Sequence, residues 1–245
     1  MPKTASYVCA FVVILQGCFA LVPFQVCSRR DPNFSNCLKL AIEDALLILE
    51  NGLPEYNIPS IQPIRISSWM VPAKLPLTYD QVFTNSEFFN YPLTVIKNVT
   101  AKIDDSNFFL DLTAHNPEIV CESNYKFDNA IINGEDLSSE GKLVFIYRNM
   151  EFRFNLTGTI VSNGGGKNIE ITGAGIDIKS MERFSIKFNG SDTEKLEKLN
   201  KFYHDNAQNL VDTELDVYEK AYAAIFKDIA NTIFSKFSFD TLFPE

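Results

Sequence analysis

The chain has 245 residues and a formal net charge of −9 at pH 7, which arises from 22 basic and 31 acidic side chains. A protein with this excess of negative charge is repelled by phosphate backbones and by anionic lipid headgroups. Nucleic-acid binding and electrostatic docking on membranes are therefore disfavoured.

Residues 1–20 have the pattern of a secretory signal peptide. They contain one lysine, an apolar run from Tyr7 to Leu15, and small residues at Cys18 and Ala20 that suit cleavage before Leu21. No later stretch approaches the roughly 20 apolar residues that a transmembrane helix needs. We therefore expect an exported, extracellular protein without integral membrane association, whose remaining residues 21–245 suffice for one large domain or two small ones.

Three cysteines remain after such a cleavage. In an oxidising compartment, Cys27 with Cys37 would close a loop of roughly ten residues, and this bond could contribute about 2 to 3 kcal/mol of stability. The third, Cys121, lies in the apolar stretch Ile119–Cys121. That context favours a buried free thiol over half of an intermolecular bridge.

An amphipathic helix is predicted from Leu38 to Glu50. Apolar residues recur along it at helical spacing, and Gly52 follows its end as a C-terminal glycine should. The prolines from Pro54 to Pro76 then predict an extended, irregular segment, because each proline removes a backbone donor and biases its predecessor away from helix.

Three runs of alternating apolar and polar residues predict β-strands over residues 93–103, 144–160 and 176–188. The apolar sides of these runs are Leu93, Val95, Val99, Ala101 and Ile103; then Val144, Ile146, Met150, Phe152, Phe154, Leu156 and Ile160; then Ile176, Ile178, Phe184, Ile186 and Phe188. Tyr147 and Asn149 fall on the polar side of the second run. Strands of roughly 12 to 17 residues exceed the usual mode of about 5 to 6. They indicate a long, strongly curved antiparallel sheet with one apolar face.

Four N-glycosylation sequons occur, at Asn33, Asn98, Asn155 and Asn189. Asn98 and Asn155 fall on the polar sides of predicted strands, and Asn189 opens the turn signal Asn-Gly. A secreted protein can be glycosylated wherever such a site is exposed. These four asparagines are therefore candidate glycosylation sites.

A long helix is predicted near the C-terminus. The capping-box pattern Ser191–Glu194 precedes a helical stripe formed by Val211, Leu215, Tyr218, Tyr222, Ile225, Ile229 and Ile233. A helix over residues 209–237 would be roughly 43 Å long at 1.5 Å per residue. We expect it to cover the apolar face of the sheet.

No catalytic or cofactor motif stands out. The two histidines, His115 and His204, have no acidic residue or cysteine at metal-ligand spacing, so no metal site is expected. The segment Gly164–Lys167 lacks the serine or threonine of a phosphate-binding loop. No Gly-x-Ser-x-Gly elbow is present. We predict a protein without enzymatic activity or cofactor, and an ester hydrolase is the least favoured alternative.

Both ends of the mature chain resemble the takeout and haemolymph juvenile hormone binding protein family of insects. The resemblance rests on the paired cysteines with the helix that follows them, on Ile58–Pro63, and on the long C-terminal helix with its Leu242–Pro244 tail. It implies an α+β fold in which a long curved antiparallel sheet wraps around one long C-terminal helix and encloses an apolar tunnel, as in tubular lipid-binding proteins. It also implies that 21–245 form a single ligand-binding domain.

The chain also departs from the family pattern. A glycine-rich bend that is common in the middle strand is replaced by Arg148–Glu151. Lepidopteran hormone carriers have a second disulfide, which Cys121 alone cannot make, so the takeout branch fits better.

The surplus of aromatic residues, with 21 phenylalanines and nine tyrosines, points to an apolar binding site or to a packed core. The residues predicted to line a site are Ile146, Phe152, Phe154, Ile178, Phe184, Ile186, Tyr218, Tyr222, Ile225 and Ile229. Tyr147, Tyr218 and Tyr222 could orient a ligand through their hydroxyls, or could be structural. The preferred hypothesis is a secreted carrier of a small hydrophobic ligand such as a terpenoid or fatty acid. The alternative is a secreted protein with a filled interior that a receptor recognises through its surface.

Overall fold

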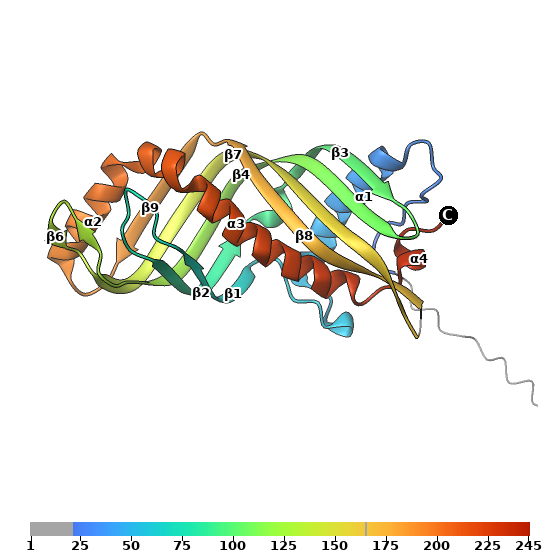
Figure 1. The fold of residues 1–245 in the computed structure, drawn as a ribbon, viewed down its shortest axis with the longest axis horizontal. Helices are drawn as coiled ribbons and strands as arrows, with labels where there is room; N and C mark the ends of the chain where they lie inside the picture. Colours follow the sequence, from blue (N-terminus) through green and yellow to red (C-terminus); the bar gives the residue numbers. More distant parts are fainter. Residues whose placement is uncertain (1–21, 165) are drawn as a thin grey trace, which may run out of the picture.

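The computed structural model describes residues 22–164 and 166–245, so the predicted signal peptide at 1–20 lies outside the described residues. Within them, seven strands form one strongly curved antiparallel sheet in the order β1-β2-β4-β7-β8, with β3 paired to β4 and β9 paired to β7 (Figure 1). The strands are β1 Ile64–Val71, β2 Gln81–Phe89, β3 Val95–Ile103, β4 Asn107–Phe127, β7 Ser139–Asn163, β8 Gly166–Ser180 and β9 Arg183–Asn189. A separate small hairpin consists of β5 Ile131–Ile132 and β6 Glu135–Asp136.

The two central strands exceed the sequence prediction, which gave β7 only over residues 144–160 and did not predict β4. β4 has 21 residues and β7 has 25, and they pair from Asn107 opposite Thr159 to Phe127 opposite Ser139. The outer edge of each is covered by two shorter strands placed end to end, β3 and β2 on β4, and β8 and β9 on β7. The predicted strand over 176–188 is therefore interrupted, at Met181 and Glu182.

The inward face of the sheet changes phase partway along the long strands. On β7, Phe145 and Tyr147 are buried before Asn149, whereas Met150 and Leu156 are buried after it. Asn149 has a left-handed backbone, with φ at 48°. This residue moves the inward-facing set of β7 from odd to even positions.

Strand β2 changes phase in the same way. Phe83 is buried before Asn85, which has φ at 49°, and Ser86 and Phe88 are buried after it. The pairing of β2 with β4 shifts register at this point. The change of phase therefore extends across neighbouring strands and belongs to the curvature of the sheet.

Some of the predicted inward residues are consequently wrong. Ile146 alternates with the buried Phe145 and Tyr147, so its side chain lies on the outer side of the sheet, whereas Tyr147 is only 6% exposed. In the first predicted strand, Leu93 and Val95 are 54% and 47% exposed. Leu93 belongs to a short 3-10 turn that precedes the strand, and for Val95 a register shift between Ile96 and Asn98 turns Ile96 inward instead.

The helices are α1 Phe34–Ile48, α2 Thr193–Asp205, α3 Ala207–Phe234 and α4 Phe239–Leu242, with short 3-10 turns at Leu49–Asn51, Pro54–Tyr56 and Tyr91–Leu93. Helix α1 begins before the predicted Leu38, and it ends near Gly52, whose φ is 73° and whose Cβ, if present, would meet Ser60 N at 2.6 Å. The N-cap of α2 is Asp192, whose carboxylate accepts from Lys195 N. The predicted irregular segment up to Pro76 contains the regular strand β1.

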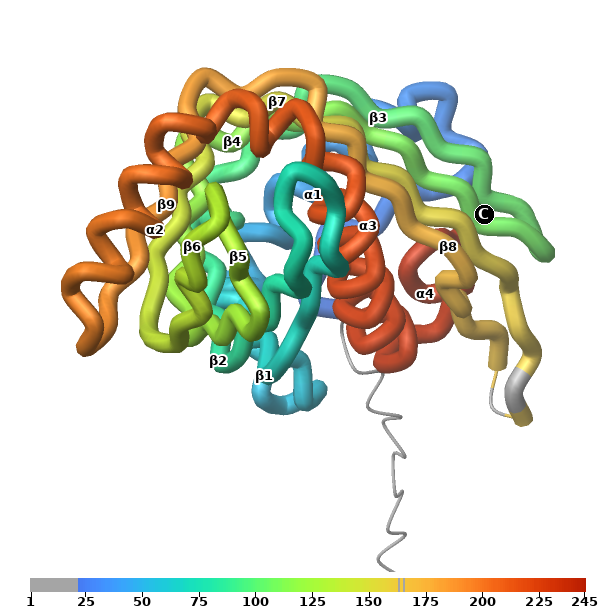
Figure 2. Tube along the Cα trace, turned by 60° about the vertical axis from the view of Figure 1, so that its left-hand side comes forward, coloured from blue at the N-terminus to red at the C-terminus, as the bar shows by residue number. Residues whose placement is uncertain are grey.

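Helix α3 runs along the open side of the curved sheet, which arches over it (Figure 2). Three hydrogen bonds join α3 to β8. Asn231 accepts from Ile171 N at 2.8 Å and donates to Ile171 O at 3.1 Å, and Glu219 Oε1 accepts from Ile178 N at 2.7 Å. The predicted fold class, a curved antiparallel sheet around one long C-terminal helix, is confirmed.

The two ends of the mature chain are in contact. The Cys27–Cys37 disulfide is present. In the loop that it closes, Arg29 N donates to Pro244 O at 2.8 Å and Arg29 Nε donates to Phe243 O at 2.9 Å. The segments that carry the family resemblance are thus hydrogen-bonded to one another.

Three of the four candidate glycosylation sites, Asn33, Asn98 and Asn189, are exposed. Asn189 is the last residue of β9 and not part of a loop. Asn155 is half-buried, because its amide lies over Gly175 on the neighbouring strand.

Candidate ligand-binding cavity

An apolar cavity of about 210 Å³ lies between the concave face of the sheet, α1 and α3. The side chains that line it are hydrophobic or aromatic, apart from a single threonine. The lining residues are Ile42, Leu46, Phe88, Tyr91, Thr94, Ile96, Leu110, Leu112, Ile119, Tyr147, Met150, Phe152, Phe154, Ile176, Ile178, Tyr222 and Phe226.

Strand pairing explains why these residues converge. Phe154 on β7 is directly opposite Leu112 on β4 and Ile176 on β8. Residues directly opposite one another project from the same face of a sheet, so this row forms a continuous apolar floor. From the other side, the Phe226 ring of α3 approaches the Phe154 ring with their centroids 5.8 Å apart.

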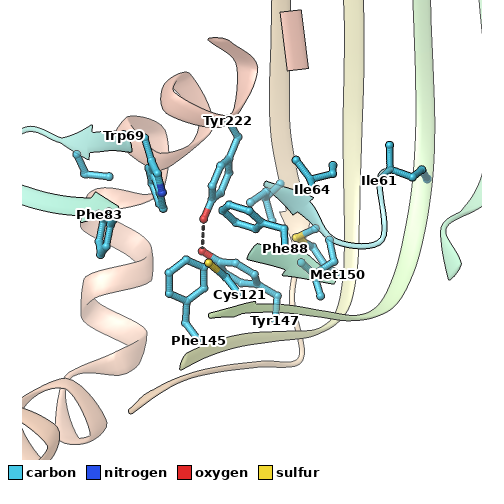
Figure 3. Close-up of a cluster of buried hydrophobic side chains, with 14 of the residues drawn as sticks. Ile61, Ile64, Trp69, Phe83, Phe88, Cys121, Phe145, Tyr147, Met150 and Tyr222 are labelled. Carbon is cyan, nitrogen blue, oxygen red and sulfur yellow. Dashed lines mark hydrogen bonds between the residues drawn. The ribbon is translucent and has the colours of Figure 1, made fainter. Parts of the chain in front are cut away.

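Two of the hydroxyl groups that belong to cavity-lining residues are hydrogen-bonded to each other. Tyr147 and Tyr222 share a hydrogen bond of 2.8 Å between their hydroxyl oxygens, inside a cluster that includes Trp69, Phe88 and Phe145 (Figure 3). Burial raises the pKa of both tyrosines, so both hydroxyls remain protonated and neutral. The cavity can therefore accept apolar groups and uncharged polar groups, and it offers no charged partner for an ion.

A second apolar cavity of about 190 Å³ lies next to the first, towards α4 and the C-terminal tail. Ile42 of α1 and Leu110 of β4 contribute to the walls of both cavities. The interior therefore contains two neighbouring apolar spaces with these side chains between them, where the sequence predicted one tunnel.

Of the ten residues predicted to line a binding site, four line this cavity, namely Phe152, Phe154, Ile178 and Tyr222. Phe184 and Ile186 lie on the inward face of β9, opposite Tyr147 and Phe145, but beyond the cavity. Ile225 and Ile229 line a different groove, between α3 and β1. Tyr218 donates from its hydroxyl to Gln81 Oε1 at 2.8 Å, and Ile146 is on the outer side of the sheet.

Several lining residues were not predicted. Leu110 and Leu112 belong to an alternating stretch of β4, from Phe108 to Ala114, that the sequence displays and that could have revealed them. The contribution of Ile42 and Leu46 had no signal of that kind, because their stripe on α1 fits any hydrophobic surface.

A buried polar cluster lies outside the cavity, between α2, α3 and the start of β2. Its centre is Glu214, which is 3% exposed and accepts from Gln81 Nε2 at 3.0 Å through Oε2, while Oε1 has no hydrogen-bond partner. Burial raises the pKa of Glu214 to about 7, despite the opposing effects of Gln81 and Lys74. Tyr79 and Tyr203 complete the cluster with a 2.9 Å hydrogen bond between their hydroxyls.

Other chemistry is not supported by the described residues. Cys121 is a buried free thiol, as predicted, and burial raises its pKa, so it is not a reactive nucleophile. Among residues 22–164 and 166–245, no group of three or more histidines, cysteines or acidic residues is placed to hold a metal ion. In the same part of the chain, no helix has both the length and the apolar character to cross a membrane.

Comparisons with known proteins gave one family match and similarities to solved structures. The sequence profile described as haemolymph juvenile hormone binding protein (JHBP) matches residues 7–244. The crystal structure of Takeout 1 from Epiphyas postvittana is similar over 90% of this chain and 100% of its own, with a TM-score of 0.72 at 12% identity. A crystal structure of lipopolysaccharide binding protein is similar over 79% of this chain and 38% of its own, with a TM-score of 0.38 at 12% identity.

No curated protein matches the chain in sequence. The Takeout 1 comparison establishes the fold, and the family profile spans nearly the whole chain. The chain therefore belongs to the haemolymph juvenile hormone binding protein family.

Proposed function

We propose that the protein is a secreted carrier that holds a slender hydrophobic ligand, such as a terpenoid or a fatty acyl chain, between the sheet and α3. Family membership and fold support a carrier of hydrophobic ligands. The observation that carries the proposal is the 210 Å³ cavity, whose walls are almost wholly apolar and which a second apolar cavity adjoins. Apolar pockets with a few polar groups are the usual form of small-molecule sites.

The binding energy in this proposal is mainly hydrophobic. A ligand that buries about 350 Å² of apolar surface gains about 9 kcal/mol at roughly 25 cal/mol per Å². The loss of translational and rotational freedom takes away part of that gain.

The proposal includes secretion and the absence of catalysis. The Cys27–Cys37 disulfide supports an oxidising compartment, and residues 1–20 supply the predicted signal peptide. The family and the fold are of the binding-protein type. Within the proposal, residues 21–245 act as one ligand-binding domain.

The test is to secrete the protein from insect cells and to analyse it by native mass spectrometry. An apolar small molecule that co-purifies, followed by saturable uptake of a fluorescent fatty acid by delipidated protein, is the expected result. The intact mass reports cleavage before Leu21 in the same experiment. Absence of both a co-purifying molecule and saturable uptake would refute the carrier and favour recognition through the surface.

A matched pair of variants locates the binding. Ile176→Trp places an indole in the cavity and should abolish uptake, whereas Lys179→Trp adds the same ring to an exposed position of β8 and should not. Equal uptake by the two variants would place the ligand elsewhere in the molecule.

A further inference from the structure

The attachment of α3 to the sheet is asymmetric. On the β8 side, Asn231 and Glu219 fix the helix to backbone groups of Ile171 and Ile178. On the β1 side, no hydrogen bond or ion pair joins α3 to β1 within residues 22–164 and 166–245. Strand β1 is an edge strand that pairs only with β2, so the seam between β1 and α3 is held by side-chain packing alone.

A groove of about 390 Å³ follows this seam. Most of its apolar residues are isoleucines, with Ile225, Ile229 and Ile233 on successive turns of α3. Its outer rim carries exposed polar groups. Ile64 of β1 contributes to its floor, and Ser67, Ser68 and Thr232 belong to its rim.

The groove and the apolar cavity are lined by neighbouring side chains. On the sheet side, Ile64 lines the groove, and its direct cross-strand partner Phe88 lines the cavity. Figure 3 shows Ile64 next to Phe88 at the margin of the buried cluster. On the helix side, Ile225 lines the groove, while its neighbour Phe226 lines the cavity.

The seam is closed beyond both ends of the groove. Towards the N-terminal half of α3, the helix is held by Gln81, which bonds Glu214 and Tyr218, and by the ion pair of Lys74 with Asp216. Beyond the C-terminal end of α3, the ring of Phe237 packs against that of Tyr56 at 4.8 Å between centroids. The part of the seam without hydrogen bonds or ion pairs is therefore limited to the stretch between β1 and residues 225–233 of α3, which we call the window.

We propose that this window between β1 and α3 is the lateral entrance through which the hydrophobic ligand reaches the cavity, an inference that rests on the proposed function. Displacement of Ile64 and Ile225 joins the groove to the cavity without breaking a backbone hydrogen bond. A ligand with one polar end slides its chain past the isoleucines while Ser67, Ser68 and Thr232 at the exposed rim hydrogen-bond the polar end. The β8 side offers no such path, since entry there would break the bonds of Asn231 and Glu219.

The entrance is tested by kinetics, because a change in an entrance alters the rates of uptake and release by the same factor and leaves the equilibrium affinity unchanged. Thr232→Trp places a bulky ring at the rim of the groove, from an exposed position of α3, and should obstruct the entrance. Ile225→Ala removes part of the side chain that separates the groove from the cavity and should widen the entrance. Ala224→Trp adds the same indole to an exposed position of α3 outside the groove and is the matched control.

Stopped-flow uptake and displacement of a fluorescent fatty acid should show both rates lowered about tenfold by Thr232→Trp, which corresponds to about 1.4 kcal/mol in the barrier. Both rates should rise in Ile225→Ala, and Ala224→Trp should match the unmodified protein. Unchanged rates in the first two variants, or a change in release alone, would overturn the entrance while the carrier function stands. Absence of uptake by the unmodified protein would overturn the carrier function and the entrance together.

Discussion

Substitution of Phe154 by aspartate tests the cavity most directly. Phe154 lies between Leu112 and Ile176 on the cavity floor, and its ring is 5.8 Å from that of Phe226. Loss of roughly 50 Å² of contact with a ligand would weaken binding by about 1.3 kcal/mol. An aspartate carboxylate there would also lose its water when the ligand enters, at a cost of several kcal/mol.

No basic side chain is among the described residues that line the cavity, so no opposite charge compensates the carboxylate. The hydroxyls of Tyr147 and Tyr222 bond each other, and Thr94 Oγ1 already accepts from Asn116 at 2.9 Å. We expect Phe154→Asp to weaken uptake of a fluorescent fatty acid by at least about 100-fold, or about 2.7 kcal/mol. Titration of the variant and of the unmodified protein with the fluorescent fatty acid at pH 7.5 measures the two dissociation constants.

Two controls distinguish loss of binding in the cavity from a general effect of charge or from unfolding. Ser185→Asp, on the exposed outer side of β9, adds the same charge and should leave the affinity unchanged. Because acid neutralises the introduced carboxyl, uptake by Phe154→Asp should partly recover at pH 4.5, which an unfolded variant would not show. Full affinity of a folded Phe154→Asp protein at pH 7.5 would refute binding in this cavity.

The remaining predictions concern stability and modification. Glu214→Gln should stabilise the fold at pH 8 by up to about 3 kcal/mol and leave it unchanged at pH 4. The reason is that burial raises the pKa of Glu214 from 4.5 to about 7, so stability present below pH 4.5 is lost as the pH rises through 7; equal effects at both pH values in chemical denaturation would contradict it. Replacing Cys27 and Cys37 together by serine should cost roughly 2 to 3 kcal/mol, and a melting temperature unchanged by the double replacement would contradict that. Asn155→Gln should leave the glycan mass of the secreted protein unchanged, because Asn155 is half-buried over Gly175; a loss of one glycan would show that the site is used.

The error at Ile146 shows a limit of alternation as a guide to a curved sheet. Alternation of two residues predicts which side chains share a face only while the backbone stays regular. One left-handed residue, Asn149, exchanges the faces of β7. The sequence marked this segment through its departure from the family's glycine-rich bend, but nothing in it stated that the phase changes there.

The distribution of Ile225, Ile229 and Tyr222 shows a second limit. These residues belong to one helical stripe, which the sequence predicted correctly as buried or half-buried. Whether a given residue faces the cavity or the seam depends on how α3 is rotated. That rotation is set by the bonds of Asn231 and Glu219 to β8, which join residues about 40 to 60 positions apart in the chain.

The sequence by itself determined the family, the helices α1 and α3 and part of the sheet, whereas the strands β1, β2 and β4 were not predicted. Periodicity is a local property, so the amphipathic stripes of α1 and α3, the predicted strands and their apolar character could be read from neighbouring residues, and the cysteine spacing and C-terminal tail identified the relatives. The tertiary structure alone decided which apolar side chains meet around empty space and which fill it. A cavity is the volume left when elements distant in the chain reach their closest packing, and that volume depends on bulges, helix rotation and long-range hydrogen bonds that no local pattern records.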